Sequence, residues 1–148
     1  MIRASLMQAP SAMGNLIRQL ETLARVPRKT AVIAAPQIDR EIRRQFAEGK
    51  DPYGRTWAKL RPATLAKHGP PPLTDTRALR SGTHAYAARS NYAGIRIRLG
   101  EPYGYFHQVG FRVGKTRVPA RRVLPQFGMP AKWREILIAS AKRAARVR

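Results

Sequence analysis

The sequence contains no cysteine, and only 8 of its 148 residues are aspartate or glutamate. The lack of cysteine excludes disulfides, thiolate zinc sites, iron–sulfur clusters and cysteine nucleophiles. Three histidines stand in different segments, and no pair of carboxylates lies at useful spacing beside any of them. Metal binding and acid–base catalysis both need such clusters. We therefore expect a protein that is not an enzyme, with no catalytic residue, no metal and no cofactor.

Long hydrophobic runs are also missing. The uninterrupted apolar stretches are only a few residues long, as in Ala31–Pro36, whereas a membrane-spanning helix needs about 20. The first residues include an arginine but no apolar segment typical of a signal peptide. We therefore expect no membrane contact and a cytoplasmic origin.

Positive charge is abundant where negative charge is scarce. With 29 lysines and arginines, the formal net charge is +21. Self-repulsion at this density favours a partner that supplies negative charge, such as nucleic acid, an acidic protein or an anionic membrane. The basic residues are spread along the chain and are densest at Arg40, Arg43 and Arg44 and at Lys142, Arg143, Arg146 and Arg148. Each cluster taken alone is equally well explained as a solvated helix face.

Helical periodicity is confined to the two ends of the chain. The spacing of Met13, Leu16, Ile17, Leu20 and Leu23 predicts a helix over Ser11–Val26, which Pro27 should end. A second helix is predicted over Thr30–Glu48, with Gly49 as its cap; Pro36 either kinks it or marks its first turn. A basic helix is predicted within 129–148, with Trp133, Ile136, Leu137, Ala141 and Ala144 on one side.

The middle of the chain predicts a loop followed by strands. Residues 50–73 are rich in proline and glycine and form a long loop with one short turn of helix over Ala63–Lys67. Residues 74–128 contain a short helix, with Thr76 as its N-cap, then the alternating strand Asn91–Leu99, a strand over Tyr105–Phe111, and a hairpin tip at Gly114 and Lys115. The pattern predicts one α+β domain with a small antiparallel sheet of about four strands.

Four segments carry recognisable motifs in order. They are Asp51–Leu60 (DPYGRTWAKL), Leu73–Arg80 (LTDTRALR), Tyr105–Gly110 (YFHQVG) and Val118–Leu124 (VPARRVL). Pro52 and Gly54 predict a turn that folds Trp57 back as a large apolar anchor on the sheet, where it would be buried. Gly110 predicts a bulge or a close backbone approach, and Pro119 an edge of the sheet or an exit from it.

These segments resemble the phage virion morphogenesis family, the tail-completion proteins of Mu-like and P2-like tailed phages. The resemblance runs from about Phe46 to the end of the chain. Arg77 stands where the family pattern has a glycine. The resemblance implies a structural subunit of a hexameric ring at the virion neck, assembled in the host cytoplasm. Its neighbours would be head-connector and tail-tube proteins, with DNA only as the passing genome.

Seven residues are the expected subunit or partner contacts: His107, Gln108, Arg121, Arg122, Lys142, Arg143 and Arg146. The arginines and Lys142 are expected on the outer face and rims of the ring rather than in a DNA channel. Two other functions stay open. Charge alone fits a basic, non-enzymatic nucleic-acid-binding protein, which should lose affinity steeply with salt. An enzyme such as a nuclease would need a partner for His107, and the sequence offers none.

Overall fold

The computed structural model describes residues 3–69, 72–73, 77–88, 93–100 and 102–146, with side chains from residue 14 onward. Its helices are α1 (Arg3–Glu48), α2 (Pro62–His68), α3 (Ala78–Gly82), α4 (Gly104–Val109) and α5 (Ala131–Arg146). Its strands are β1 (His84–Ala87), β2 (Ile95–Arg98), β3 (Phe111–Val113) and β4 (Thr116–Val118). The fold is thus a mixture of helices and small antiparallel sheets, with helices at both ends of the chain.

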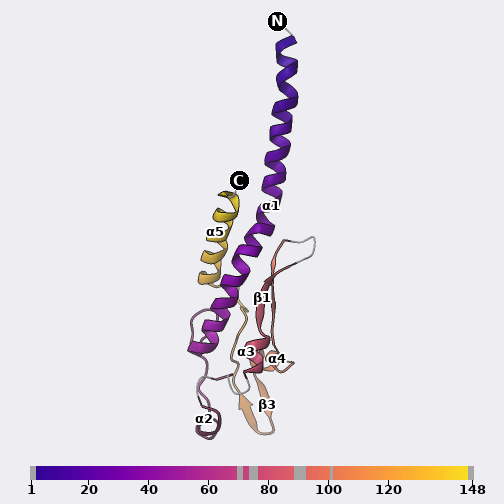
Figure 1. Ribbon diagram of the computed structural model, residues 1–148. Helices are drawn as coiled ribbons and strands as arrows, with labels where there is room; N and C mark the ends of the chain where they lie inside the picture. Colours follow the sequence, from indigo (N-terminus) through magenta and orange to yellow (C-terminus); the bar gives the residue numbers. More distant parts are fainter. Residues whose placement is uncertain (1–2, 70–71, 74–76, 89–92, 101, 147–148) are drawn as a thin grey trace.

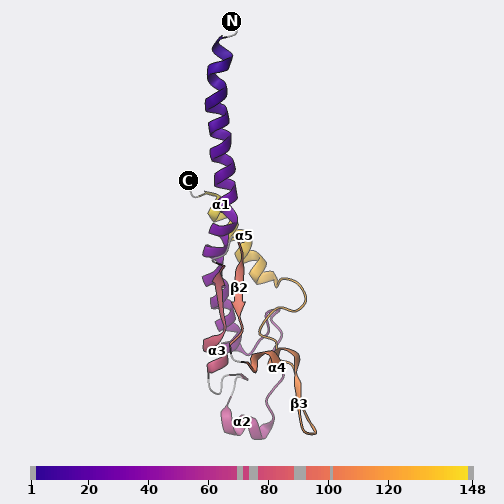
Figure 2. The same ribbon diagram turned by 90° about the vertical axis from the view of Figure 1, so that its right-hand side faces the viewer.

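Helix α1 is a long rod that organises the molecule. Its C-terminal half packs against α5 on one side and β1 on the other, while its N-terminal half projects beyond the body as an arm (Figures 1 and 2). The prediction that Pro27 separates two helices is wrong. Pro27 is exposed, so water can hydrate the carbonyl that loses its partner, and no glycine lies near it to stop the helix. The rod changes direction where the arm meets the body (Figure 1), as an interior proline would cause.

The core lies where α1 meets the rest of the chain. Ile38, Ile42 and Phe46 bury one side of α1, and α5 adds Trp133 and Ile136. The predicted apolar face of α5 and the predicted apolar positions Ile38, Ile42 and Phe46 of α1 are therefore confirmed. Val32, a fourth position predicted from the same periodicity, is 58% exposed. Pro36 lies inside α1 and does not end it.

Two separate hairpins replace the expected sheet of about four strands. β1 pairs with β2 and β3 pairs with β4, each antiparallel. The predicted strand Tyr105–Phe111 is wrong for most of its length, because Gly104–Val109 forms helix α4. Gly104 allows this helix to sit tightly on the body: a Cβ there would lie 2.8 Å from Leu99 Cγ. Only Phe111 remains to begin β3, and the hairpin tip at Gly114 and Lys115 is confirmed.

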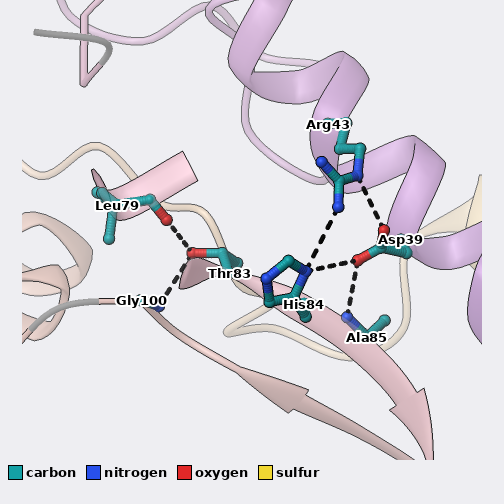
Figure 3. A network of polar contacts seen from close by, with 7 residues as sticks. All are labelled: Asp39, Arg43, Leu79, Thr83, His84, Ala85 and Gly100. Carbon is teal, nitrogen blue, oxygen red and sulfur yellow. Dashed lines mark hydrogen bonds and ion pairs between the residues drawn. The ribbon is translucent and has the colours of Figure 1, made fainter. Parts of the chain in front are cut away.

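A polar network fastens the first hairpin to α1 (Figure 3). The Asp39 carboxylate accepts hydrogen bonds from the Ala85 backbone N–H at 3.0 Å and from Arg43 Nε at 2.9 Å. His84 Nδ1 lies 3.7 Å from the same carboxylate and 3.4 Å from the Arg43 guanidinium. The charge on Arg43, which looked available to a partner in the sequence, is thus neutralised within the chain.

Thr83 joins three segments at the base of that hairpin (Figure 3). Its hydroxyl donates to the Leu79 carbonyl at 2.6 Å and accepts from the Gly100 N–H at 3.0 Å. Gly100 is required there, because a Cβ would lie 2.7 Å from the Leu79 carbonyl oxygen and from Gly82. Thr76, the expected N-cap of α3, lies outside the described residues.

Candidate functional site

The predicted turn after α1 is present and orders the start of the 50–73 loop. The buried Asp51 carboxylate accepts hydrogen bonds from the backbone N–H groups of Tyr53 at 2.9 Å and Arg55 at 2.8 Å. Pro52 is buried and Gly54 adopts φ +84, as a tight turn requires. This part of the loop is therefore fixed by its own hydrogen bonds, while α2 lies farther along near its predicted position.

Trp57 is the buried anchor that the motif predicted. Its side chain is 4% exposed and meets Phe46 edge-on, with ring centroids 5.6 Å apart. Its indole Nε1 donates to the Arg122 carbonyl at 2.8 Å. Trp57 thus binds the turn to α1 and to the 118–124 segment, rather than to a sheet.

The Tyr53 hydroxyl is a junction that the sequence did not reveal. It accepts hydrogen bonds from the N–H groups of Gln126 at 3.0 Å and Phe127 at 2.7 Å, and it donates to the Gly128 carbonyl at 2.9 Å. One phenol therefore fixes the loop before α5. A tyrosine after Asp-Pro carries no local pattern that signals such a distant contact.

Arg121 lies inside the fold, so the prediction that it stands on an exposed rim is wrong. It is 5% exposed. Its Nε donates to the Ala58 carbonyl at 2.9 Å and an Nη donates to the Lys59 carbonyl at 3.2 Å. Burial lowers the pKa of the Arg121 guanidinium.

Gln108 is likewise a structural residue within the subunit. Its Oε1 accepts from the N–H groups of Val123 at 2.9 Å and Leu124 at 3.0 Å, and its Nε2 donates to the Leu124 carbonyl at 2.7 Å. The side-chain amide hydrogen-bonds to the 123–124 backbone as the backbone of a neighbouring strand would. This contact joins the motif at 105–110 to the motif at 118–124.

His107 is half-buried beside Arg121. The Arg121 backbone N–H donates to the His107 carbonyl at 2.7 Å. Burial, and then the charge of Arg121, lower the pKa of the His107 ring. The ring nitrogen Nδ1 is buried without a hydrogen-bond partner among the described residues.

Gly110 and Pro119 lie where the motifs predicted. Gly110 has φ +79, and a Cβ there would lie 3.0 Å from the Ala120 nitrogen and the Val118 oxygen. The predicted close backbone approach is confirmed. Pro119 is exposed and directly follows β4, at the predicted exit from the strand.

The remaining basic candidates lie at the surface. Arg122 is half-exposed, with its guanidinium 5.3 Å from the Phe127 ring centroid. Lys142, Arg143 and Arg146 are exposed on α5. Whether these residues contact a partner stays a prediction.

Two exposed apolar surfaces stand out. The arm stripe is formed by Leu16, Ile17, Leu20 and Leu23 on α1, which are 49–63% exposed. The aromatic patch is formed by Tyr105, Phe106, Val109 and Val113 around α4 and β3, which are 47–64% exposed. The two surfaces lie at opposite ends of the molecule, since the arm points away from α4 and β3 in both views (Figures 1 and 2).

The described part of the chain lacks two features. It contains no group of three or more histidine or acidic side chains able to hold a metal ion. None of its helices is both long and apolar enough to cross a membrane.

No protein-family model, curated protein or solved structure matches this chain.

Proposed function

We propose that this chain is a structural subunit of a ring at the phage neck, which completes the tail or joins it to the head. The observation that carries the proposal is the pair of unlike apolar surfaces at opposite ends of one subunit, the arm stripe and the aromatic patch. Large apolar side chains gathered on a surface mark interaction sites. Two different patches on one chain suit a head-to-tail contact, which closes into a ring when the rotation allows.

The arm stripe supports an assembly role because, in a monomer, these four exposed apolar side chains do not contribute to the core. Leu16, Ile17, Leu20 and Leu23 continue the apolar face that α1 buries against α5 and β1 farther along. The same face is thus covered by the subunit itself at one end of the helix and left open at the other. We propose that the aromatic patch of a neighbouring subunit covers it.

One backbone detail supports the family resemblance. Arg77, which stands where the family pattern has a glycine, adopts φ +59. Glycine takes this left-handed conformation at no steric cost, whereas other residues are strained by it. The backbone at Arg77 is therefore one that a glycine at this position would adopt without strain.

The surface charge fits contacts with acidic neighbouring rings. Lys142, Arg143 and Arg146 form an exposed basic end on α5. Charge pairing at such a rim would set register and docking speed more than affinity. Head-connector and tail-tube proteins, in a virion, are the proposed partners, and a ring of six copies is the proposed assembly.

The test is the mass of the protein in solution, measured by native mass spectrometry on two matched variants. Leu20→Glu places a charge in the arm stripe, and Gln19→Glu places the same charge on an exposed neighbouring position of the same helix. We expect the wild type and Gln19→Glu to form the same ring and Leu20→Glu to be monomeric with an unchanged circular dichroism spectrum. A monomeric wild type, or a ring in all three proteins, would contradict the proposal.

A second candidate is nucleic-acid binding, which the net charge of +21 favours. A protein of this kind would bind through many phosphate contacts, so its affinity would fall steeply with salt. The ring is held by apolar contacts, so its mass should persist in high salt. Mass measured at two salt concentrations, with and without duplex DNA, separates the two functions.

A further inference from the structure

A basic cavity lies between α2, α4 and the second hairpin. Its volume is about 590 Å³, within the range of ligand sites in proteins. Leu60, Leu73 and Leu79 supply apolar lining, and Tyr103 and two threonines supply hydroxyl groups. The cavity is distinct from the arm stripe and includes none of the aromatic patch residues.

The charged side chains among the described residues that line the cavity are all positive: Lys59, Arg61, Arg117 and Arg121. Two histidines, His68 and His107, also line it. No aspartate or glutamate occurs among the described residues that line the cavity. The region therefore has an excess of positive charge next to an apolar surface.

Arg121 places one of these positive charges at a fixed position in the cavity wall. Its guanidinium is buried and donates to the carbonyls of Ala58 and Lys59, which are neutral groups. No carboxylate among the described residues forms an ion pair with it. A buried charge without a counter-charge is costly, and an incoming anion would offset that cost. His107 lines the same cavity, and its buried Nδ1 has no hydrogen-bond partner among the described residues, so it adds a second polar group that a ligand could satisfy.

We infer that this cavity binds an acidic peptide segment of another protein, with carboxylates toward Arg61, Arg117 and Arg121 and an apolar side chain against the leucines. This inference does not depend on ring formation. It adds a binding site for a partner to a subunit whose apolar contacts are at its ends.

A second copy of this chain is a poor source of the segment, because most of its acidic side chains are engaged. Asp39, Glu41, Glu48 and Glu135 form ion pairs within the subunit, and Asp51 holds the turn after α1. Nucleic acid is less suited because a duplex cannot enter a cavity of this size, and its backbone offers nothing apolar for the leucine lining. A peptide that alternates carboxylates and aliphatic side chains matches both parts of the lining.

Fluorescence anisotropy on the full chain tests this inference. The probe is a labelled peptide of alternating leucine and glutamate, compared with one of leucine and glutamine and with a short single-stranded DNA. We expect the acidic peptide to bind, and Arg61→Ala or Arg117→Ala to weaken it by about fivefold each. The matched control is Arg112→Ala, which removes the same charge from the cross-strand partner of Arg117 but from outside the cavity. It should leave the affinity unchanged.

A second readout comes from the histidine in the wall. A carboxylate bound beside the ring favours protonated His107, so saturating peptide should raise its pKa in an NMR titration. No binding of the acidic peptide would overturn the inference. Equal weakening by Arg112→Ala, or displacement of the peptide by DNA at lower concentration, would overturn it too, since either would indicate general attraction to the basic surface.

Discussion

At the scale of single residues, this subunit uses its motif side chains to join distant parts of its own backbone. Trp57 and Gln108 bind the 122–124 segment, and Arg121 binds the carbonyls of 58–59. The burial of Trp57 could be predicted from the sequence, because a large apolar side chain that follows a turn with proline and glycine is expected to pack against the body of the protein. The burial of Arg121 could not be predicted in this way. The sequence around an arginine between a strand and a loop does not reveal whether the guanidinium binds backbone carbonyls or another protein.

Trp57→Ala should lower the free energy of unfolding by about 3–5 kcal/mol, the range for a buried aromatic side chain. The loss combines the contact with Phe46 and the hydrogen bond to Arg122. Chemical denaturation measures it, with Phe127→Ala as the control because Phe127 is 67% exposed. Equal effects of the two variants would show that Trp57 is not the anchor.

Arg77→Gly should raise the free energy of unfolding by up to about 1 kcal/mol. Arg77 at φ +59 carries a left-handed strain of about 1–2 kcal/mol, partly offset by the greater freedom of glycine in the unfolded chain. Arg80→Gly, inside α3, should instead lower stability. Thermal melts of the two variants measure these effects. A loss of stability in Arg77→Gly would show that Arg77 is not strained in the folded chain.

His107 should make the subunit less stable in mild acid. The pKa of the folded ring lies below its ordinary value of 6.5, so the unfolded chain binds more protons in the window between these values. Its contribution to stability is complete above about pH 6.5 and is lost as the pH falls toward the lowered pKa. His107→Phe keeps an aromatic ring against Tyr103 and Phe111 and should flatten this part of the stability profile. An unchanged slope would assign the pH dependence to other groups.

At the scale of elements, periodicity predicted where helices form better than it predicted where they end. One helix, α4, was predicted as a strand. The apolar spacing of α5 and of the second half of α1 reflects a face that the core fills. The run Tyr105–Phe111 looks like a strand because aromatic residues favour strands, yet α4 forms there. The close packing of Gly104 against Leu99 and Leu79 favours the helix. This tertiary contact cannot be recognised in the local sequence.

Pro27→Ala should strengthen the arm without changing the stability of the body. Proline in a helix interior costs about 3 kcal/mol relative to alanine, and Pro27 lies where the arm leaves the packed part of α1. Hydrogen exchange should show slower amide exchange over residues 14–26, with the thermal midpoint of the body unchanged. Faster exchange of the arm would contradict a continuous helix through Pro27.

At the scale of the whole molecule, the proposed assembly follows from where the subunit leaves apolar surface uncovered. Sequence patterns predicted the periodic apolar face of the arm, but periodicity does not say what covers a face. The structure leaves Leu16, Ile17, Leu20 and Leu23 exposed at one end and the aromatic patch exposed at the other. A head-to-tail ring is the arrangement that would cover both.

Cysteine cross-linking is the most direct measurement of that contact, because the natural chain has no cysteine to interfere. A double variant, Leu20→Cys with Val109→Cys, carries one thiol in the arm stripe and one in the aromatic patch. Under mild oxidation and denaturing electrophoresis, it should give a ladder of covalent oligomers that ends at the number of subunits in the ring. Each single variant should stay monomeric. Dimers from the Leu20→Cys variant alone, or no ladder from the double variant, would contradict a ring built by arm-to-patch contacts.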